Sequence, residues 1–125
     1  MTANKGPKRA LGDRFESSVC KHLSQRGLKL LARNYQCKLG ELDIVMLDHG
    51  TIVFIEVKYR RSHHFGFSAE QVTPGKQQKL VKAAKTFLAE HVQYQSLPAR
   101  FDVVGVSGEP GRPEINWIKG AFYAS

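Results

Sequence analysis

The sequence predicts an α/β (α+β) fold in which helices flank a mixed central sheet, with the elements in the order αβββαβ and a short final strand. Two observations carry this prediction. Apolar residues recur every three or four positions in two segments, as on one face of a helix, and runs rich in β-branched residues lie between and after these segments. The 125 residues suit one domain, expected at residues 10–125 after a flexible basic N-terminal segment at residues 1–9.

The first half of the domain is predicted to hold one helix and three strands. A helix over residues 10–26 is indicated by apolar residues four apart: Leu11, Phe15, Val19 and Leu23. Strands are expected at residues 28–35, 41–47 and 51–59, with turn residues at 48–50. In the second strand, alternation places Leu42, Ile44 and Met46 on one face and Glu41, Asp43 and Val45 on the other. The third strand is apolar almost throughout up to Ile55, as in a central strand covered on both faces.

The second half is predicted to hold a helix and two strands. After a loop at residues 60–72, Thr73 and Pro74 indicate the beginning of a helix, with threonine as the cap and proline in the first turn. This helix is expected to run to about residue 92. A fourth strand is expected at residues 101–106, a loop at 108–113 and a short fifth strand at 115–118.

The charge balance gives the first indication of a partner. Nineteen lysines and arginines against eleven acidic residues give a net charge of +8, which favours a polyanion, above all nucleic acid. A soluble protein that is merely basic is the alternative. The longest purely aliphatic or aromatic run, residues 52–55, is far shorter than the roughly 20 residues that span a bilayer. Because the N-terminus also lacks the apolar stretch of a secretory signal, we expect a cytoplasmic protein without membrane contact.

Two acidic residues are predicted to face each other across the hairpin of the second and third strands. If His49-Gly50 is a two-residue loop, counting outward places Asp43 opposite Glu56. Directly opposed residues have Cβ atoms about 4.5–5.5 Å apart, so two carboxylates there repel unless something compensates, most simply a divalent cation. Period-two alternation then places Lys58 on the same face as Glu56. The sequence thus predicts a patch of two acids and one lysine.

This combination of side chains suits the hydrolysis of a phosphodiester. Magnesium is usually held by one or two protein carboxylates, with water and substrate phosphate completing its coordination. A bound metal polarises the phosphoryl oxygen and lowers the pKa of a bound water, and a lysine stabilises charge on the phosphate. The alternative is that these residues are only the solvated face of a strand. Against it, Glu56 shares its face with Ile52 and Phe54 in a strand predicted to be buried.

A family resemblance rests on these residues. Gly40-Glu41-Leu42-Asp43-Ile44-Val45, followed by Phe54-Ile55-Glu56-Val57-Lys58, resembles the PD-(D/E)XK nuclease signature. From about Gly12 to Phe122 the chain is similar to the small YraN-type family of uncharacterised bacterial proteins, and this family is similar to archaeal Holliday junction resolvases. The resemblance is also carried by Gly12, Glu16, Arg33-Asn34, Gly66, Val72-Thr73-Pro74, Lys76-Gln77, Arg100 to Val104 and Ala121-Phe122. Leu42 stands where the signature has its proline, a position that does not bind metal.

The resemblance implies a restriction-endonuclease-like fold, a Mg²⁺ or Mn²⁺ cofactor and roles for particular residues. It assigns Asp43 and Glu56 as metal ligands and Lys58 as the catalytic lysine. Glu16 matches a helix acid that approaches the metal site in resolvase-like relatives; a surface or capping carboxylate is the alternative. Glu41, two residues before Asp43 and on the same face, is either a further ligand, a group behind the ligands or a charge at the edge of the strand.

Residues next to this site are expected to contact nucleic acid. Arg60 and Arg61 follow the site directly and are candidates for contacts to backbone phosphates. The second helix carries lysines three residues apart, and this stripe either tracks a nucleic acid or is an ordinary solvated face; the candidate contacts on it are Lys76, Gln77 and Lys79. Trp117 and Asp102 are expected to be structural, with Arg100 or Lys58 as the partner of Asp102.

The sequence therefore predicts a metal-dependent endonuclease that acts on nucleic acid, DNA before RNA, and on branched or structured DNA in particular. One alternative is a nucleic-acid-binding module that keeps the fold with little or no catalysis. Another is a basic structural or ribosome-associated protein. The likeness to resolvases, which act as dimers, implies a homodimer, although the sequence has no obvious dimer seam.

Overall fold

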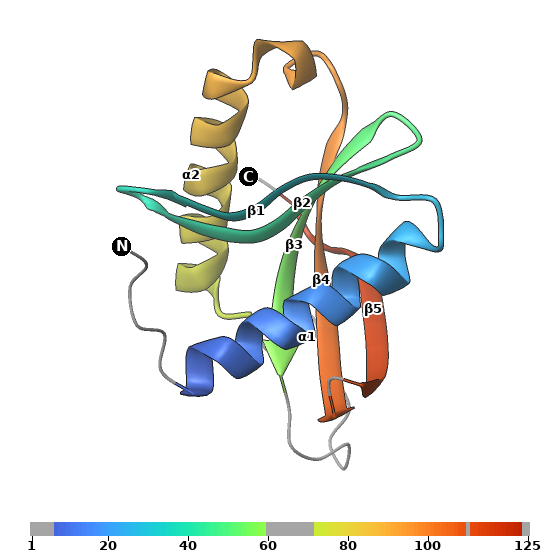
Figure 1. The fold of residues 1–125 in the computed structure, drawn as a ribbon. Coiled ribbons are helices and arrows are strands. Elements are labelled where there is room, and N and C mark those ends of the chain that lie inside the picture. The colour runs from blue at the N-terminus through green and yellow to red at the C-terminus, as the bar shows by residue number, and fades with distance from the viewer. Residues whose placement is uncertain (1–6, 60–71, 110, 124–125) are drawn as a thin grey trace, which may run out of the picture.

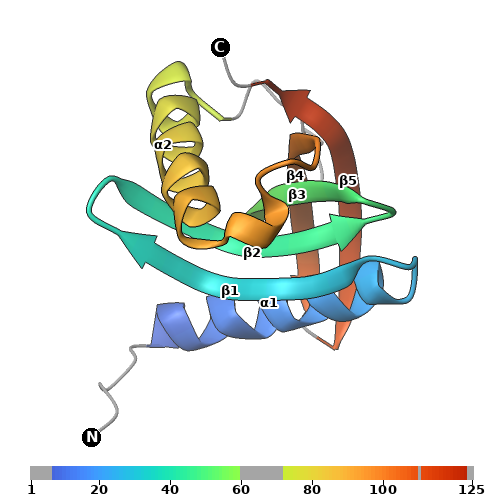
Figure 2. The same cartoon turned by 90° about the horizontal axis from the view of Figure 1, so that it is seen from above.

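The computed structural model describes residues 7–59, 72–109 and 111–123, and it has two long helices packed on opposite faces of a five-stranded sheet (Figure 1; Figure 2). The strands follow chain order across the sheet; β3 and β4 are parallel and all other neighbours are antiparallel. This confirms the predicted α/β fold with a mixed sheet. In chain order the elements are α1 (Pro7–Ser24), β1 (Lys29–Cys37), β2 (Gly40–Asp48), β3 (Thr51–Tyr59), α2 (Pro74–Glu90), the short 3-10 helix η2 (Val92–Tyr94), β4 (Ala99–Glu109) and β5 (Arg112–Phe122).

Each face of the sheet has its own hydrophobic layer. The layer under α1 joins Phe15, Val19 and Leu23 to apolar residues of β2, β3 and β4. The layer under α2 joins Leu80, Ala84 and Phe87 to the opposite faces of the same strands. Phe15, Val19 and Leu23 of the first predicted helix are thus confirmed as core, and so are Leu80, Ala84 and Phe87 of the second. Val92, expected at the end of the same apolar stripe, is instead exposed on η2. β3 is covered on both sides, as its apolar run indicates. None of the described helices is long and apolar enough to cross a membrane.

Several predicted boundaries were wrong, and the last strand shows the reason. β5 spans Arg112–Phe122 instead of residues 115–118, and Glu109 pairs with Arg112, so a tight hairpin replaces the loop predicted at 108–113. β5 is an edge strand held by backbone pairing, and it needs no continuous apolar run; Pro113 is tolerated there because one side of an edge strand has no partner. At the other end, α1 begins at Pro7, three residues earlier than predicted.

The hairpin of β2 and β3 has the register that the two-residue loop predicts. Backbone pairing is continuous from the turn to the middle of the strands, with the pairs Asp48–Thr51, Leu47–Ile52, Val45–Phe54 and finally Ile44–Ile55. Asp43 and Glu56 are the next residues beyond this last pair. The two acids therefore do not form a ladder pair, and they lie where β2 leaves the side of β3.

The alternation of faces in β2 also changes at this point. Leu42 packs with Val45 in the layer under α2, whereas Ile44 and Met46 face α1. The prediction that Leu42 shares a face with Ile44 was therefore wrong. A strand keeps period-two alternation only while it is regular. β2 stays paired with β1 as far as Gly40, but it loses its pairing with β3 beyond Ile44. This irregularity directly flanks Asp43.

Candidate metal centre

Asp43 and Glu56 meet at the place where β2 and β3 separate. The backbone N–H of Val57 donates to Asp43 Oδ2 over 2.9 Å, which attaches the Asp43 side chain to β3 in place of a further ladder bond. Glu56 is buried, with 7% of its surface exposed, and it lies near enough to Asp43 that the charge of Asp43 raises the pKa of Glu56. The approach of two acids that the hairpin register predicts is thus present, by a side-chain route.

Burial makes both carboxyl groups hold their protons more tightly than usual. Burial raises the pKa of Glu56 to about 7, and the charge of Asp43 adds to this effect. Burial likewise raises the pKa of Asp43, although the N–H of Val57 opposes the shift by stabilising the carboxylate. Near neutral pH the pair therefore favours a positive charge between its oxygens, which either a proton or a metal ion supplies.

Two lysines approach Glu56 from different elements. The Nζ atom of Lys58, two residues further along β3, lies 4.0 Å from Glu56 Oε1. The Nζ atom of Lys76, in the first turn of α2, lies 3.6 Å from the same oxygen. The side chains of Lys58 and Lys76 are 32% and 35% exposed. They therefore lie between the buried acid and the solvent. Lys76 was predicted only as a nucleic-acid contact, and the structure places it at the centre itself.

The beginning of α2 sets the position of Lys76. The hydroxyl of Thr73 accepts a hydrogen bond from the Lys76 backbone N–H over 3.2 Å, and Pro74 occupies the first turn. This is the cap that the sequence predicts, and such a cap satisfies an N–H that would otherwise lack a partner inside the helix. The cap thereby fixes the residue whose side chain reaches Glu56.

A third acid lies on the α1 side of the centre. Burial raises the pKa of Glu16 to about 7, and the charge of Asp43 contributes next. Glu16 Oε1 is buried, lacks a hydrogen-bond partner among the described residues and lies 3.9 Å from the guanidinium of Arg33. Arg33 in turn donates to the hydroxyl of Ser17 and to the backbone carbonyl of Asp13. Arg33 thus ties β1 to α1 beside Glu16, a role that the sequence did not reveal.

The hairpin of β1 and β2 approaches α2 very closely at Gly40. A Cβ atom at this position would lie 3.0 Å from the backbone carbonyl oxygen of Lys79, so any other residue would push this backbone aside. Glycine is therefore favoured where β2 begins, three residues before Asp43. Glu41 is exposed, and its negative charge raises the pKa of both Asp43 and Glu16. It acts on the centre through its charge.

The remaining predicted residues bond to other groups, are exposed, or fall outside the described part of the chain. The amide of Gln77 donates to the backbone carbonyl of Val72 over 2.9 Å, just before the helix. Lys79 is exposed on α2. Arg60 and Arg61 fall outside the described residues. Asp102 is structural, as predicted: it is fully buried and accepts hydrogen bonds from Arg100 and Trp117.

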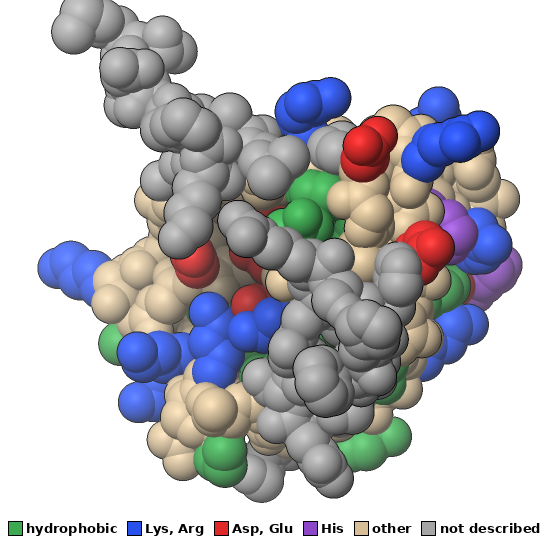
Figure 3. Space-filling view, turned by 90° about the horizontal axis from the view of Figure 1, so that it is seen from below, with side chains coloured by type: hydrophobic (Ala, Val, Ile, Leu, Met, Phe, Trp, Pro, Cys, Tyr) green, Lys and Arg blue, Asp and Glu red, His purple; other side chains and the backbone are tan. Residues whose placement is uncertain are grey.

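The oxygen donors of this centre fit a hard divalent cation. Mg²⁺ binds oxygen ligands and commonly uses only one or two carboxylates, with waters and a phosphate completing its six positions. Within the described ranges, no group of three or more His, Cys, Asp or Glu residues is arranged to hold a metal by itself. The pair therefore suits an open site. Figure 3 looks onto the end of the molecule where β3 ends, and acidic side chains there lie recessed beside Lys and Arg side chains.

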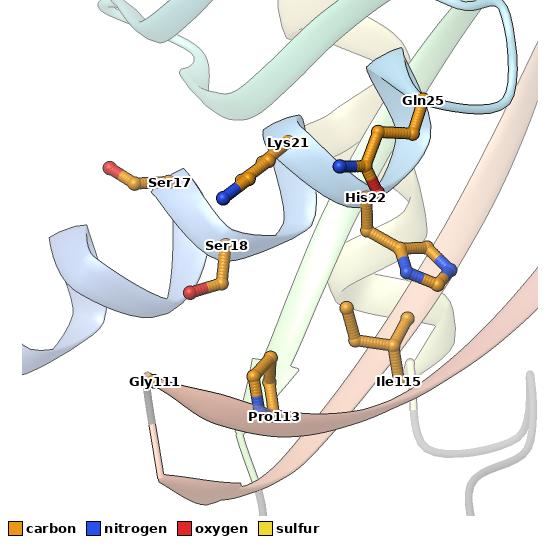
Figure 4. Close-up of a pocket in the computed structure, with 8 residues that line it drawn as sticks. All are labelled: Ser17, Ser18, Lys21, His22, Gln25, Gly111, Pro113 and Ile115. Atoms are coloured by element: carbon orange, nitrogen blue, oxygen red, sulfur yellow. The ribbon is translucent and has the colours of Figure 1, made fainter.

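A separate surface pocket of about 470 Å³ lies between α1 and the beginning of β5 (Figure 4). Lys21 and His22 of α1 and Pro113 and Ile115 of β5 contribute to its walls. The hydroxyl of Ser18, also in its wall, donates to the backbone carbonyl of Arg14. The residues that line this pocket include no acid, so it takes no part in the candidate metal centre.

The fold and the site together define a class of protein. One helix, three antiparallel strands, a second helix and a strand parallel to the third form a restriction-endonuclease-like α/β core, with acids on the second and third strands. The sequence model of the Uncharacterised protein family UPF0102 matches residues 15–106, and the chain belongs to this family. This confirms the predicted membership of a small bacterial family.

Relatives of similar length share nearly half of the sequence. The chain is 48% identical to a UPF0102 protein of Stutzerimonas stutzeri, over 89% of this chain and 92% of that one. It is 45% identical to a UPF0102 protein of Pseudomonas putida, over 98% of each chain. Among solved structures it is similar to Pyrococcus furiosus SfsA in complex with Ca²⁺, with 15% identity and a TM-score of 0.35, over 90% of this chain and 63% of that one.

Proposed function

We propose that this UPF0102 protein is a metal-dependent endonuclease that hydrolyses phosphodiester bonds of DNA, with branched or structured DNA as the preferred substrate. The observation that carries the proposal is the buried Asp43–Glu56 pair with two lysines on Glu56. Two acids that can hold a metal ion and two lysines that can bind a phosphate thus lie close together. The preference for branched DNA, and a homodimer that would serve it, follow from the likeness to resolvases.

Asp43 and Glu56 would hold Mg²⁺ or Mn²⁺. The metal, when bound, would polarise the phosphoryl oxygen and lower the pKa of a coordinated water. The protein's own contribution is to hold the two carboxylates in a fixed, partly desolvated place, Asp43 through the N–H of Val57 and Glu56 through its position in the buried strand. Ligands held in this way need little reorganisation when the ion binds.

The two lysines would bind and stabilise the phosphate. In the described structure both ammonium groups are directed at Glu56. A phosphate bound next to Glu56 would be a second anion within reach of the same two lysines. Lys58, on the strand of Glu56, is the catalytic lysine that the family resemblance implies, and Lys76 is a second cation supplied by α2. Removing either charge would weaken stabilisation of the negative charge that develops during hydrolysis.

Glu16 would exchange a proton near neutral pH. Its pKa of about 7 means that protonated and ionised forms coexist at working pH, which is the condition for efficient general acid–base catalysis. Its buried Oε1 atom accepts no hydrogen bond from any described residue and offers an acceptor for a water molecule. We assign Glu16 this proton-transfer role and assign metal binding to Asp43 and Glu56.

Cleavage of a panel of labelled DNAs tests the proposal. Linear duplex, flapped duplex and four-way junction would be incubated with the protein and with Mg²⁺, Mn²⁺ or EDTA. We expect cleavage that requires the metal and is faster on the branched DNAs. Binding measured in EDTA should fall steeply with salt, because neutralised phosphates release counterions.

Intact DNA in every reaction, with binding retained, would contradict the proposal. That outcome would favour the alternative of a nucleic-acid-binding module with little or no catalysis. The structure offers one observation in favour of that reading, since the charges of Lys58 and Lys76 offset the charge of Glu56.

A further inference from the structure

We propose that the outer face of α2, together with Tyr123 at the end of β5, binds single-stranded nucleic acid, with one unpaired base stacked on the Tyr123 ring. The inference rests on the proposed function for the kind of ligand, a nucleic acid, and it adds where the ligand lies and which form of it is bound. The observation that carries it is an exposed aromatic ring that shares a pocket with two lysines.

Tyr123 is the most exposed large hydrophobic residue of the described chain, at 76% of its surface. It follows directly after β5, and its hydroxyl lies against the backbone at Gly120. A Cβ atom at Gly120 would lie only 3.2 Å from this hydroxyl, and the φ of Gly120 is +59°. Glycine at position 120 therefore allows the left-handed backbone and leaves room for the Tyr123 hydroxyl. The Tyr123 ring remains open to the solvent.

Tyr123 and one face of α2 enclose a pocket of about 370 Å³. Residues of α2 at a spacing of three and four form the opposite wall, among them Gln78, Val81, Lys82 and Lys85. Lys82 and Lys85 are exposed, and so is Gln78. The pocket thus offers an aromatic plane, an apolar floor, a free amide and two positive charges.

Single-stranded nucleic acid matches these groups better than duplex does. Proteins that bind single strands combine a basic surface that follows the phosphates with aromatic rings on which bases stack. Within a duplex no base can present a whole face to Tyr123, because each internal base is covered by its neighbours on both sides. A duplex would contact the lysines alone and leave the ring unused. The chain's net charge of +8 favours a polyanion in either case.

The position of the pocket connects it to the candidate metal centre. Pro74, in the first turn of α2, belongs to its wall, and Lys76 in the same turn reaches Glu56. A strand bound along α2 would therefore continue towards Asp43 and Glu56. This geometry points to DNA with a single-stranded arm, such as a flap, as the substrate class.

The test compares binding of a fluorescent oligo(dT) strand and of a duplex of equal length in EDTA, so that no cleavage takes place. Tyr123→Ala is expected to weaken binding of the single strand by about 5- to 100-fold, the scale of one stacked base. Tyr123→Phe keeps the ring and should bind as the wild type does. Duplex binding should be unchanged in both variants. Val92→Ala, at an exposed site on η2, serves as the control for loss of a surface apolar group.

Three results would overturn the inference. In the first, the wild type fails to bind the single strand. In the second, Tyr123→Ala weakens binding of the single strand and of the duplex equally. In the third, Tyr123→Phe binds the single strand as poorly as Tyr123→Ala does. The proposed nuclease function fails independently, through absence of metal-dependent cleavage. If the wild type cleaves DNA but Tyr123→Ala binds the single strand normally, only the stacking site is rejected. If Tyr123→Ala weakens binding of the single strand but no DNA is cleaved, only the nuclease function is rejected.

Discussion

Replacing Asp43 by asparagine is expected to lower metal-dependent cleavage of DNA by roughly 10²–10³-fold, the scale seen when one group that stabilises a developing charge is removed. The substitution removes the negative charge that would bind the cation. It keeps an amide oxygen that can accept the hydrogen bond from the Val57 N–H, so the junction of β2 and β3 should remain folded. Cleavage rates of the two proteins at equal concentration, with binding measured in EDTA, give the comparison.

Two further acid-to-amide variants sharpen this experiment. Glu90→Gln is the matched control. At 1.5 Å per helical residue, Glu90 lies about 21 Å further along α2 than Lys76, and it accepts a hydrogen bond from Tyr35. Glu41→Gln tests the predicted further ligand. Since Glu41 is exposed and acts on Asp43 through its charge, we expect a much smaller loss. Wild-type cleavage by Asp43→Asn would contradict the assignment of Asp43.

Replacing Asp102 by alanine is expected to have the largest effect on stability, a loss of about 3–5 kcal/mol in the free energy of unfolding. Asp102 is fully buried on β4. Its carboxylate accepts hydrogen bonds from the Arg100 guanidinium, from Trp117 Nε1 over 2.8 Å and from the Gly120 N–H over 2.9 Å. Alanine would leave the donors of these three residues without this partner, and it would leave the half-buried Arg100 with Asp48 as its remaining counter-charge.

Denaturant unfolding followed by fluorescence measures this loss, and Trp117, the one tryptophan of the chain, reports on the same site. Asp102→Asn is the conservative companion variant. It keeps an oxygen acceptor but loses the charge, so its loss of stability should fall between that of alanine and the wild type. An unchanged unfolding midpoint in Asp102→Ala would show that these hydrogen bonds add no net stability.

Local sequence patterns predicted most of the fold because they reflect local physics. The apolar period of four in α1, the Thr73 cap of α2 and the apolar run of β3 each depend on neighbours in the chain, and all three are present in the structure. The length of β5 could not be predicted in this way. An edge strand is defined by pairing with β4, which begins ten or more residues earlier in the chain.

The residues of the candidate site likewise fall into those that local sequence patterns place and those that tertiary packing places. Asp43, Glu56 and Lys58 were predicted to lie together because a two-residue turn fixes the register of a hairpin, although the exact pairing was wrong where β2 leaves β3. Lys76 and Arg33 were not assigned to the site, since their positions depend on how α2 and α1 pack on the sheet. A residue that reaches a site through tertiary packing carries no local signal for that role.

Calorimetric titration with Mg²⁺ tests most directly the claim that Asp43 and Glu56 form a metal centre. The ligand must be deprotonated to bind, so protons compete with the metal. Because the pKa of Glu56 is about 7, we expect one bound ion at about pH 8, clearly weaker binding at about pH 5.5, and no binding by Glu56→Gln at either pH. An isotherm of Glu56→Gln that matches the wild type, or a wild type that binds no Mg²⁺ or Mn²⁺ at about pH 8, would contradict it.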